Sequence, residues 1–264
     1  MLNATQRDHF LVVAGLIVGL FLTPAAPAAG LNDSGQQTCY NGSTLVACTA
    51  ANTGDAATYP RQDGRYGRDA AATTGALTKS GGAAGFDFTA LDATGQPTTP
   101  SSGPTPHPCV RDNVTNLTWE VKTDDGGLRD RDWIYAWYST DNATNGGNAG
   151  NSGGDSCGGT LAAYANRCNT TNYIAAVNAA ALCGFTDWRL PSVRELQTLV
   201  HYGASNPAID TTYFPNTPAS LFWSASSYGS DPALAWIVYF LDGFVGTDTK
   251  VLGDLVRLVR GGQL

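Results

Sequence analysis

Six cysteines constrain the fold of this chain more than any other feature of its sequence. Their number is even, and in an exported protein an even number favours disulfide bonds over metal ligation. No two of them have the two-residue spacing of a zinc knuckle or a redox motif. Two short spacings predict two local bridges, and the remaining two cysteines are then left for a long-range bridge. The predicted pairs are Cys39–Cys48, Cys157–Cys168 and Cys109–Cys183.

Export is expected from the N-terminal segment. Arg7 precedes an apolar run from Phe10 to Leu22, and Ala26-Pro27-Ala28 supplies the small residues of a signal-peptidase site. The run is shorter than the roughly 20 residues of a membrane-spanning helix. We therefore predict a signal peptide over residues 1–28 and, after its cleavage, a chain with no membrane span. Such a chain is secreted, displayed at the cell surface or held in the periplasm; a retained anchor is the alternative.

The charge balance argues against one class of partner. The chain has 22 acidic and 15 basic residues and a net charge of −7, so nucleic-acid binding has no electrostatic support. Of the acidic residues, 20 are Asp, which favours turns and caps, whereas Glu favours helix surfaces. Together with 31 Gly and 13 Pro, this composition predicts strands and loops with few helices.

The mature chain divides into three regions. Residues 29–84 are rich in Gly, Ala and Thr, and we expect an extended, partly ordered arm with one small disulfide loop. Residues 85–108 hold one strand and a Pro-rich linker. All six Trp lie in residues 109–264, which must therefore hold the hydrophobic core.

Two helices are expected in this last region. Tyr173–Cys183 has apolar residues at helical spacing and is followed by Gly184, a good C-cap. The next helix opens with a capping box, in which Ser192 accepts from the amide of Glu195 and the Glu195 carboxylate reaches back. Gly203 is expected to end it.

Strands precede and follow these helices. One strand is expected within residues 113–122, and residues 139–160 are expected to form a long irregular loop. Four more strands close the chain, at residues 221–225, 235–240, 244–250 and 255–260. Asp242-Gly243 predicts a hairpin turn between the second and third of these. The order predicts an α+β fold, with two helices beside a mostly antiparallel sheet whose first and last strands, near Val114 and Val259, are neighbours.

Several segments occur in an order that resembles a known family. They cover residues 109–122, 127–130, 183–196, 222–227, 235–240 and 256–260. Over about residues 109–264 the chain is similar to the Lcl C-terminal domain family, named after a bacterial collagen-like adhesin, and Asp187-Trp-Arg-Leu-Pro-Ser is the most specific part. The resemblance implies adhesion and a C-type-lectin-like fold, related to that of formylglycine-generating enzymes. Leu258 stands where family members often carry Cys, so the disulfide pattern of the family does not transfer.

No catalytic constellation stands out in the sequence. His107 lies in the Pro-rich linker and His201 at a helix end, where surface or structural roles are expected rather than membership of a triad. Glu120 and Glu195 are the only Glu residues, and Glu195 is explained as a cap, which argues against a glycosidase pair. Asp187 is expected to be a buried turn or salt-bridge residue.

A cofactor is not expected, and calcium is the metal that fits best. Asn151, Asp155 and the carbonyls of the loop at 139–160 are hard oxygen donors. No Asp-x-Asp-x-Asp spacing is present to strengthen a calcium site. The metal and the oligomeric state therefore stay open.

The sequence suggests a core-organising role for one set of residues and a ligand-binding role for another. Trp188 and Arg189 are expected to organise the core, with Trp188 against the second helix and Arg189 paired with a carboxylate such as Asp187 or with backbone carbonyls. In the superfold that the sequence resembles, ligands meet the loops beside the last strands. This implies a ligand-binding set of Tyr228, Asp231, Asp242 and Phe244.

The predicted function is that of a secreted or cell-surface binding module. Its partner is expected to be a glycan, the extracellular matrix or a surface protein, for instance at the tip of a fibre or pilus. Two alternatives are an oxidoreductase of the formylglycine-generating type, which resembles the chain in fold only, and a structural component of the cell envelope.

Overall fold

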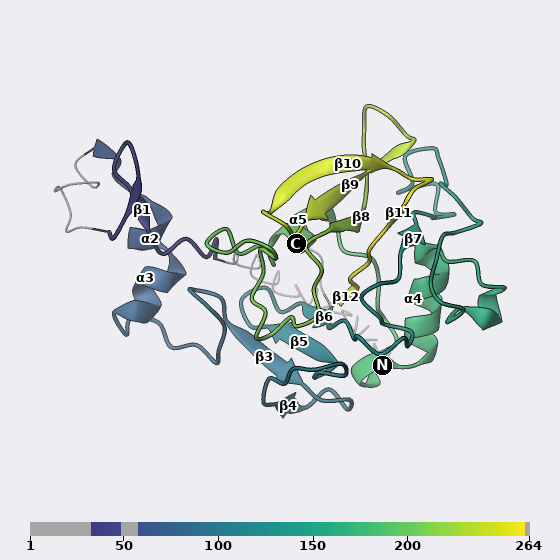
Figure 1. The fold of residues 1–264 in the computed structure, drawn as a ribbon, viewed down its shortest axis with the longest axis horizontal. Helices are drawn as coiled ribbons and strands as arrows, with labels where there is room; N and C mark the ends of the chain where they lie inside the picture. Colours follow the sequence, from purple (N-terminus) through teal and green to yellow (C-terminus); the bar gives the residue numbers. More distant parts are fainter. Residues whose placement is uncertain (1–32, 49–57, 262–264) are drawn as a thin grey trace, which may run out of the picture.

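The computed structural model describes residues 33–48 and 58–261. The predicted signal peptide over residues 1–28 lies outside these residues. The described chain forms a large body and a smaller N-terminal lobe beside it (Figure 1). Among the described residues, no helix is long and apolar enough to cross a membrane.

A five-stranded antiparallel sheet forms one part of the large body. Its strands, in spatial order, are β12 (Val259–Arg260), β6 (Thr118–Glu120), β5 (Cys109–Asp112), β3 (Phe88–Leu91) and β4 (Pro97–Thr98). Trp119 lies opposite Val110 on one side and opposite Val259 on the other. Strands from the two ends of the domain are therefore neighbours, as the sequence predicted.

A three-stranded antiparallel sheet lies above it in Figure 1. Its strands are β8 (Leu221–Ser227), β9 (Leu234–Tyr239) and β10 (Phe244–Thr249). The predicted hairpin turn between β9 and β10 is confirmed. The Asp242 carboxylate accepts from the Phe244 amide at 2.9 Å, and Gly243 has a φ of +85°, a conformation that favours glycine.

The last predicted strand, over residues 255–260, is largely wrong. Only β12 is regular, while Gly253–Asp254 (β11) pairs with Tyr135–Ala136 (β7). At Leu258 the ladder is only half made: the carbonyl accepts from the Glu120 amide at 3.0 Å, but the amide donates to the Glu120 carboxylate at 2.9 Å instead of to a backbone carbonyl.

Both predicted helices exist but are shorter than expected. α4 (Thr170–Ala179) begins at its cap Asn169 and stops before Cys183, because Ala181 and Cys183 have φ values of +48° and +54° that a helix does not allow. A short 3-10 turn, η2 (Leu182–Gly184), follows. α5 (Val193–Gln197) has the predicted capping box and ends well before Gly203. A further 3-10 turn, η1 (Ala162–Tyr164), lies between the predicted irregular loop at 139–160 and α4.

All three predicted disulfides are present. They join Cys39 to Cys48, Cys157 to Cys168, and Cys109 to Cys183. The last bridge links β5 to η2 across 74 residues and ties the five-stranded sheet to the end of the α4 region.

Trp188 is buried, with 2% of its surface exposed, as predicted for a core-organising residue. Its partner differs from the prediction. The Trp188 amide donates to the Asn178 side chain at 2.8 Å, the Asn178 amide group donates back to the Trp188 carbonyl at 2.9 Å, and the indole donates to the Leu182 carbonyl at 3.1 Å. The neighbour of Trp188 is therefore the end of the first helix, α4, rather than the second helix.

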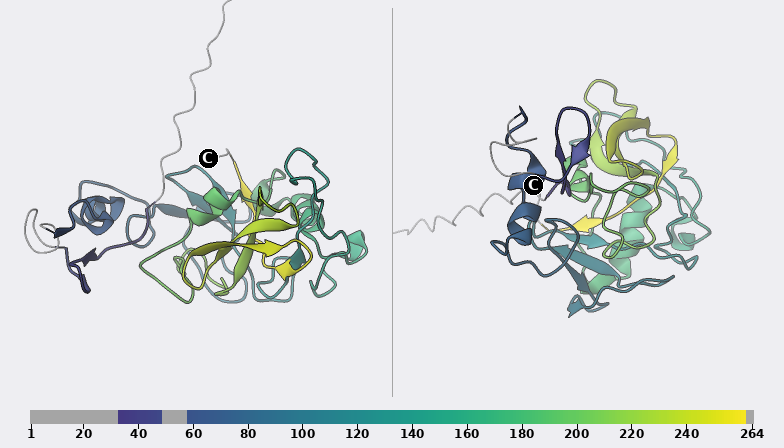
Figure 2. Two further views of the ribbon diagram at one scale, coloured as in Figure 1. Left: turned by 90° about the horizontal axis from the view of Figure 1, so that it is seen from above. Right: turned by 60° about the vertical axis from the view of Figure 1, so that its left-hand side comes forward.

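The N-terminal lobe contains more regular structure than the sequence suggested. It holds the disulfide-closed hairpin of β1 (Cys39–Tyr40) and β2 (Leu45–Val46), and two short helices, α2 (Asp63–Tyr66) and α3 (Arg68–Thr73). Two further views show the lobe projecting from one end of the large body (Figure 2).

The segment at 85–108 was predicted to be a strand followed by a linker. Its strand, β3, pairs with β5 over four residues, so this segment belongs to the large body. His107, between two prolines, is 4% exposed, and its ring Nε2 lies 2.9 Å from the Tyr213 carbonyl oxygen. The Pro-rich stretch thus packs onto the domain, and His107 has the structural role that was expected.

Candidate functional site

The described structure has a cleft of about 590 Å³ in the large body. Four segments that are distant in the sequence surround it: the chain after β7, the first turn and a half of α4, the segment from Arg189 to Glu195, and the end of β8. Its lining combines aromatic and aliphatic residues with many residues that carry hydroxyl groups. Ligand sites are commonly concave surfaces of this mixed kind.

An ion pair forms one wall of the cleft. Arg189 donates twice to Glu195, at 2.7 Å to Oε1 and 2.9 Å to Oε2. The backbone of Arg189 is fixed by two 2.9 Å hydrogen bonds with Val259 of β12. Arg189 thus pairs with a carboxylate, as expected, but the carboxylate is that of Glu195 rather than Asp187. Asp187 instead pairs with Arg260 at 2.7 Å.

Glu195 is fixed from three directions. It accepts from Arg189 and from the Ser192 amide at 2.8 Å, while its own amide donates to the Ser192 hydroxyl at 3.2 Å. Burial alone would raise the pKa of Glu195, but the hydrogen bonds and the charge of Arg189 outweigh burial and lower it. Glu195 is therefore ionised and neutralised by Arg189, an arrangement that suits binding better than proton transfer.

Three serine hydroxyls in the cleft are oriented by the backbone. The Ser139 and Ser192 hydroxyl oxygens accept from amides two and three residues further along the chain, at 3.3 and 3.2 Å, and that of Ser226 accepts from the first amide of α5 at 3.1 Å. A hydroxyl oxygen that accepts such a bond keeps its proton for another acceptor. The cleft thus presents a set of hydroxyl donors at fixed places.

Tyr138 and Ile174, both half-buried, also line the cleft. The backbone of Tyr138 is clamped by α4: its amide donates to the Thr170 hydroxyl at 3.0 Å, and its carbonyl accepts from Thr170 at 2.9 Å and Thr171 at 2.6 Å. The backbone of Tyr138 is thereby fixed to the first turn of α4. Asp141 adds an exposed carboxylate at the rim, and hydrogen bonds from the Ala143 amide and the Thr144 hydroxyl lower its pKa.

The four residues predicted to bind a ligand do not form one surface. Tyr228 and Asp231 lie in the connection from β8 to β9, and Asp242 and Phe244 lie at the β9–β10 turn. These places are at opposite ends of β9, so about 17 Å separates them at the rise of an antiparallel strand.

Each of the four has a local environment of its own. Tyr228 packs edge-on against Trp236 with ring centroids 5.3 Å apart, and the carboxylates of Asp231 and Asp242 accept from amides of their own turns. Phe244 is 60% exposed. None of the four lines the cleft.

The sequence pointed to part of the cleft for a different reason. Arg189, Ser192 and Glu195 were assigned structural roles, which they have, yet they also line the cleft. Tyr138, Ser139 and Ile174 were not identified, because nothing in their local sequence marks them. The Asn- and Gly-rich composition of residues 139–160, a loop long enough to approach a site, was the only signal.

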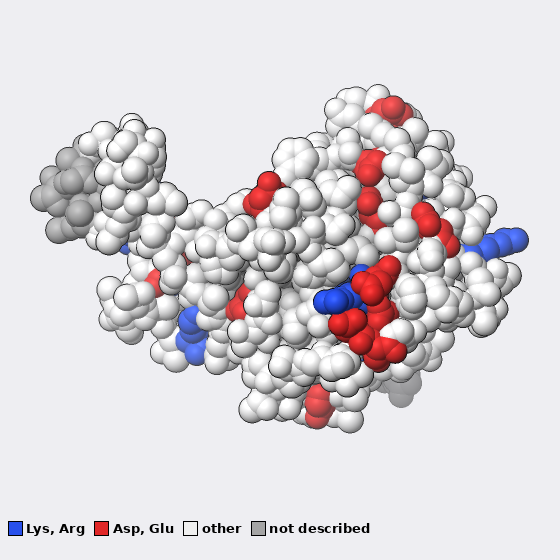
Figure 3. All heavy atoms as spheres, viewed as in Figure 1, with Lys and Arg blue, Asp and Glu red and all other residues white. Residues whose placement is uncertain are grey.

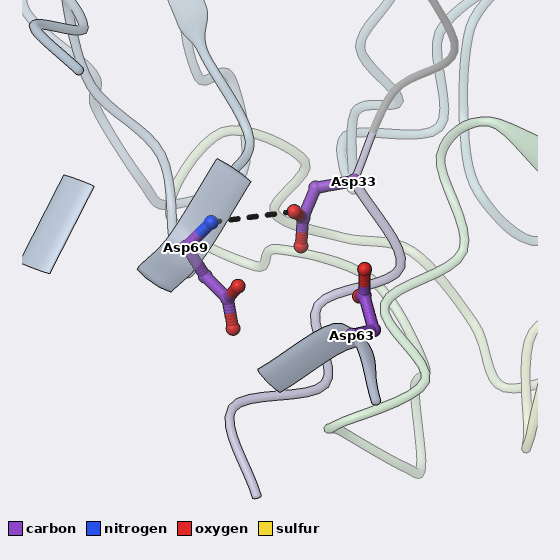
Figure 4. Close-up of side chains that lie close together, drawn as sticks. All are labelled: Asp33, Asp63 and Asp69. Carbon is purple, nitrogen blue, oxygen red and sulfur yellow. Dashed lines mark hydrogen bonds between the residues drawn. The ribbon is translucent and has the colours of Figure 1, made fainter. Parts of the chain in front are cut away.

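Three carboxylates meet in the N-terminal lobe, where Asp33, Asp63 and Asp69 point toward one another (Figure 4). Each of them has a structural partner. Asp33 accepts from the first amides of α3, at 3.0 Å from Arg68 and 3.4 Å from Asp69, so it caps that helix from a distant segment. Asp69 accepts from the Ala70 amide at 2.7 Å, and Asp63 accepts from the Ser34 hydroxyl.

Acidic side chains gather beside basic ones on the face drawn in Figure 3. A second group of converging carboxylates lies beside Arg131. Its carboxylates belong to Asp124, Asp130 and Asp132, and Arg131 lies 3.2 Å from Asp124 and 3.8 Å from Asp132. Asp130 is buried and accepts from three amides of its own loop at 2.6 to 2.9 Å. These two groups are the places in the described chain where carboxylates converge as metal ligands would.

The predicted calcium donors fall outside both groups. Asn151 accepts from the Gly153 amide at 2.9 Å in a local turn, and Asp155 lies against the backbone of Gly253. Glu120, the other Glu of the chain, is fully buried with Lys122 and Tyr173 and does not line the cleft.

The comparisons with known proteins give one finding. The family model described as the Lcl C-terminal domain matches residues 108–260, more than half of the chain. No curated protein and no solved structure matched. The mixed α+β class with mostly antiparallel sheets is observed, whereas the C-type-lectin-like architecture stays a prediction.

Proposed function

Because this chain belongs to the Lcl C-terminal domain family, we propose that it is an exported binding module that recognises a glycan in the cleft between α4, α5 and β8. The family takes its name from an adhesin, which makes adhesion the natural setting. Three disulfides fit a protein that works outside the reducing cytoplasm.

The composition of the cleft walls is the single observation that carries the choice of a glycan. A sugar ring has apolar faces that pack on an aromatic side chain and hydroxyl groups at its edges that accept and donate hydrogen bonds. Tyr138 and Ile174 supply the apolar wall, and the backbone-oriented hydroxyls of Ser139, Ser192 and Ser226 supply the donors. Asp141 supplies an acceptor at the rim.

Binding rather than chemistry is part of the proposal. Arg189 and Glu195 are oppositely charged and neutralise each other in the cleft wall. Glu195 also completes the α5 capping box, so neither residue is poised to exchange a proton. The oxidoreductase alternative needs thiols that bind a metal, and the six cysteines are all in disulfides. A copper titration of the mildly reduced, folded protein separates the two. Stoichiometric tight binding of copper would favour the enzyme, and its absence would favour the binding module.

A glycan array with the purified mature chain tests the proposal directly. It should carry neutral, acidic and sulfated oligosaccharides, with immobilised matrix proteins as a separate panel, and should be read with calcium and with a chelator. We expect binding to a defined group of oligosaccharides that survives chelation. Binding only to matrix proteins, or to nothing, would contradict the glycan proposal, and binding lost on chelation would add a metal to the site.

A further inference from the structure

One edge of the cleft is formed by a segment without regular secondary structure, the rim loop. Residues 139–151 contain three residues that line the cleft, Ser139, Asp141 and Thr144, but no helix or strand. Backbone bonds close its base, from the Ser139 amide to the Ala149 carbonyl at 2.9 Å and from the Asn151 amide to the Trp137 carbonyl at 3.0 Å. The middle of this rim loop is held partly by bonds within the loop, such as the Asn145 amide to the Asp141 carbonyl at 2.9 Å, and partly by groups outside it.

A buried ammonium group connects the rim loop to the rest of the large body. Lys250, in the turn after β10, is 1% exposed, and its Nζ donates to the carbonyls of Asn145 at 2.8 Å and Asn148 at 2.9 Å, both in the rim loop. Its third bond goes to the Ser227 hydroxyl at 3.1 Å, at the end of β8. Because an ammonium group has three protons, all of them are used.

Two further contacts connect this anchor to the cleft. The Lys250 Nζ lies 4.1 Å from the centre of the Trp137 ring, and that ring is part of the cleft wall. The Ser227 hydroxyl also donates to the Thr144 carbonyl at 3.2 Å, so the rim loop is joined to β8 at a second point. Lys250 itself does not line the cleft, and it takes part in none of the ion pairs found among the described residues.

We propose that Lys250 is the positioning residue of the cleft: its ammonium group holds the rim loop against β8, and ligand affinity depends on that group although it does not touch the ligand. This inference rests on the proposed function for its ligand. The anchoring itself follows from the three hydrogen bonds and needs no ligand to be tested.

The chain offers a matched control for a variant at this position. Lys79 also donates to backbone carbonyls, including those of Gly82 at 2.6 Å and Phe86 at 3.3 Å, but it lies in the segment before β3 and away from the cleft. Lys79→Met therefore removes a comparable set of bonds without touching the rim loop.

The experiment compares Lys250→Met and Lys79→Met by hydrogen exchange and by affinity for the neutral trisaccharide that binds best on the array. In Lys250→Met, we expect the Ser139 and Asn151 amides to exchange at least about tenfold faster, and the dissociation constant to rise by about tenfold or more. In Lys79→Met, both quantities should match those of the wild type.

The proposal fails if folded Lys250→Met keeps its rim-loop protection, or if protection is lost and affinity is unchanged. Lys250→Gln, which keeps a polar donor without the charge, decides by the same criteria if Lys250→Met does not fold. A wild-type protein that binds no saccharide overturns the proposed function, and the exchange rates alone then decide whether Lys250 anchors the loop.

Discussion

Arg189, whose backbone pairs with Val259 of β12, forms a bidentate ion pair with Glu195 in the first turn of α5. The pair performs two tasks at once, because Glu195 also completes the capping box with Ser192. One side of the pair is buried and the other faces the cleft, with 1% of the Glu195 side chain and 26% of the Arg189 side chain exposed. The same contact therefore holds the fold and shapes the proposed binding site.

Glu195→Ala should lower the free energy of unfolding by about 2–4 kcal/mol, because it removes a helix cap and leaves Arg189 without its carboxylate. Asp187→Ala, which breaks the more exposed pair with Arg260, should cost less than about 1 kcal/mol. Urea denaturation at neutral pH measures both. Equal losses in the two variants would mean that burial of the pair does not matter.

The lowered pKa of Glu195 predicts that its contribution to stability is lost at acid pH. The pKa of Glu195 is lowered in the folded state, so its contribution is complete above the ordinary value of 4.5 and is lost as the pH falls below it. The stability gap between the wild type and Glu195→Ala should therefore shrink on acidification. A gap that stays constant down to acid denaturation would argue that the carboxylate does not act through its charge.

Asp254 should show the opposite pH dependence. Burial and the charge of Asp248 raise the pKa of Asp254 to about 7, and its Oδ2 atom has no hydrogen-bond partner among the described residues. A raised pKa means that stability is complete at low pH and is lost as the pH rises through 7. Asp254→Asn should thus be more stable than the wild type by about 2–4 kcal/mol at alkaline pH and similar to it at acid pH. Thermal unfolding of the wild type and Asp254→Asn from acid to alkaline pH measures this difference in stability. A variant that is less stable than the wild type at alkaline pH would contradict the prediction.

Removal of the long-range disulfide should destabilise the large body. Cys109 and Cys183 are 74 residues apart, and a loop of that length predicts a loss of about 4–5 kcal/mol when both are replaced by Ala. Because all six Trp lie at or beyond Trp119, tryptophan fluorescence reports on the large body alone. The Cys39→Ala, Cys48→Ala variant should have a free energy of unfolding, followed by tryptophan fluorescence, within about 0.5 kcal/mol of that of the wild type. An equal effect from the two bridges would mean that the lobe and the body unfold together.

Local signals in the sequence predicted much of this fold. The capping box of Ser192 and Glu195, the turn at Asp242-Gly243 and the three disulfides each depend on residues or spacings that determine their own geometry. The errors arose where tertiary contacts decide. The first helix stops before Cys183, which is bridged to Cys109, and the last strand is interrupted where Leu258 bonds to the Glu120 side chain.

The candidate site was harder to predict because no local pattern describes it. Tyr138, Ile174 and Ser226 come from three segments and meet only after the helices and sheets have packed. Lys250 joins a distant loop through backbone carbonyls, which any sequence offers. The residues named from the sequence, such as Tyr228 and Phe244, were placed by the superfold that the sequence resembles and by their chemistry, and neither determines which segments converge on the cleft.

We propose above that the ligand binds in the cleft beside α4. The most direct test of this proposal is the affinity of two tyrosine variants for the best-bound trisaccharide, measured by calorimetry. Tyr138→Ala removes a cleft wall whose backbone stays clamped by Thr170, and Tyr228→Ala removes a ring that packs on Trp236 away from the cleft. We predict that Tyr138→Ala raises the dissociation constant by about tenfold or more, while Tyr228→Ala changes it by less than about twofold. A folded Tyr138→Ala protein that binds like the wild type, with binding lost in Tyr228→Ala, would contradict the claim and move the site to the β8–β9 connection.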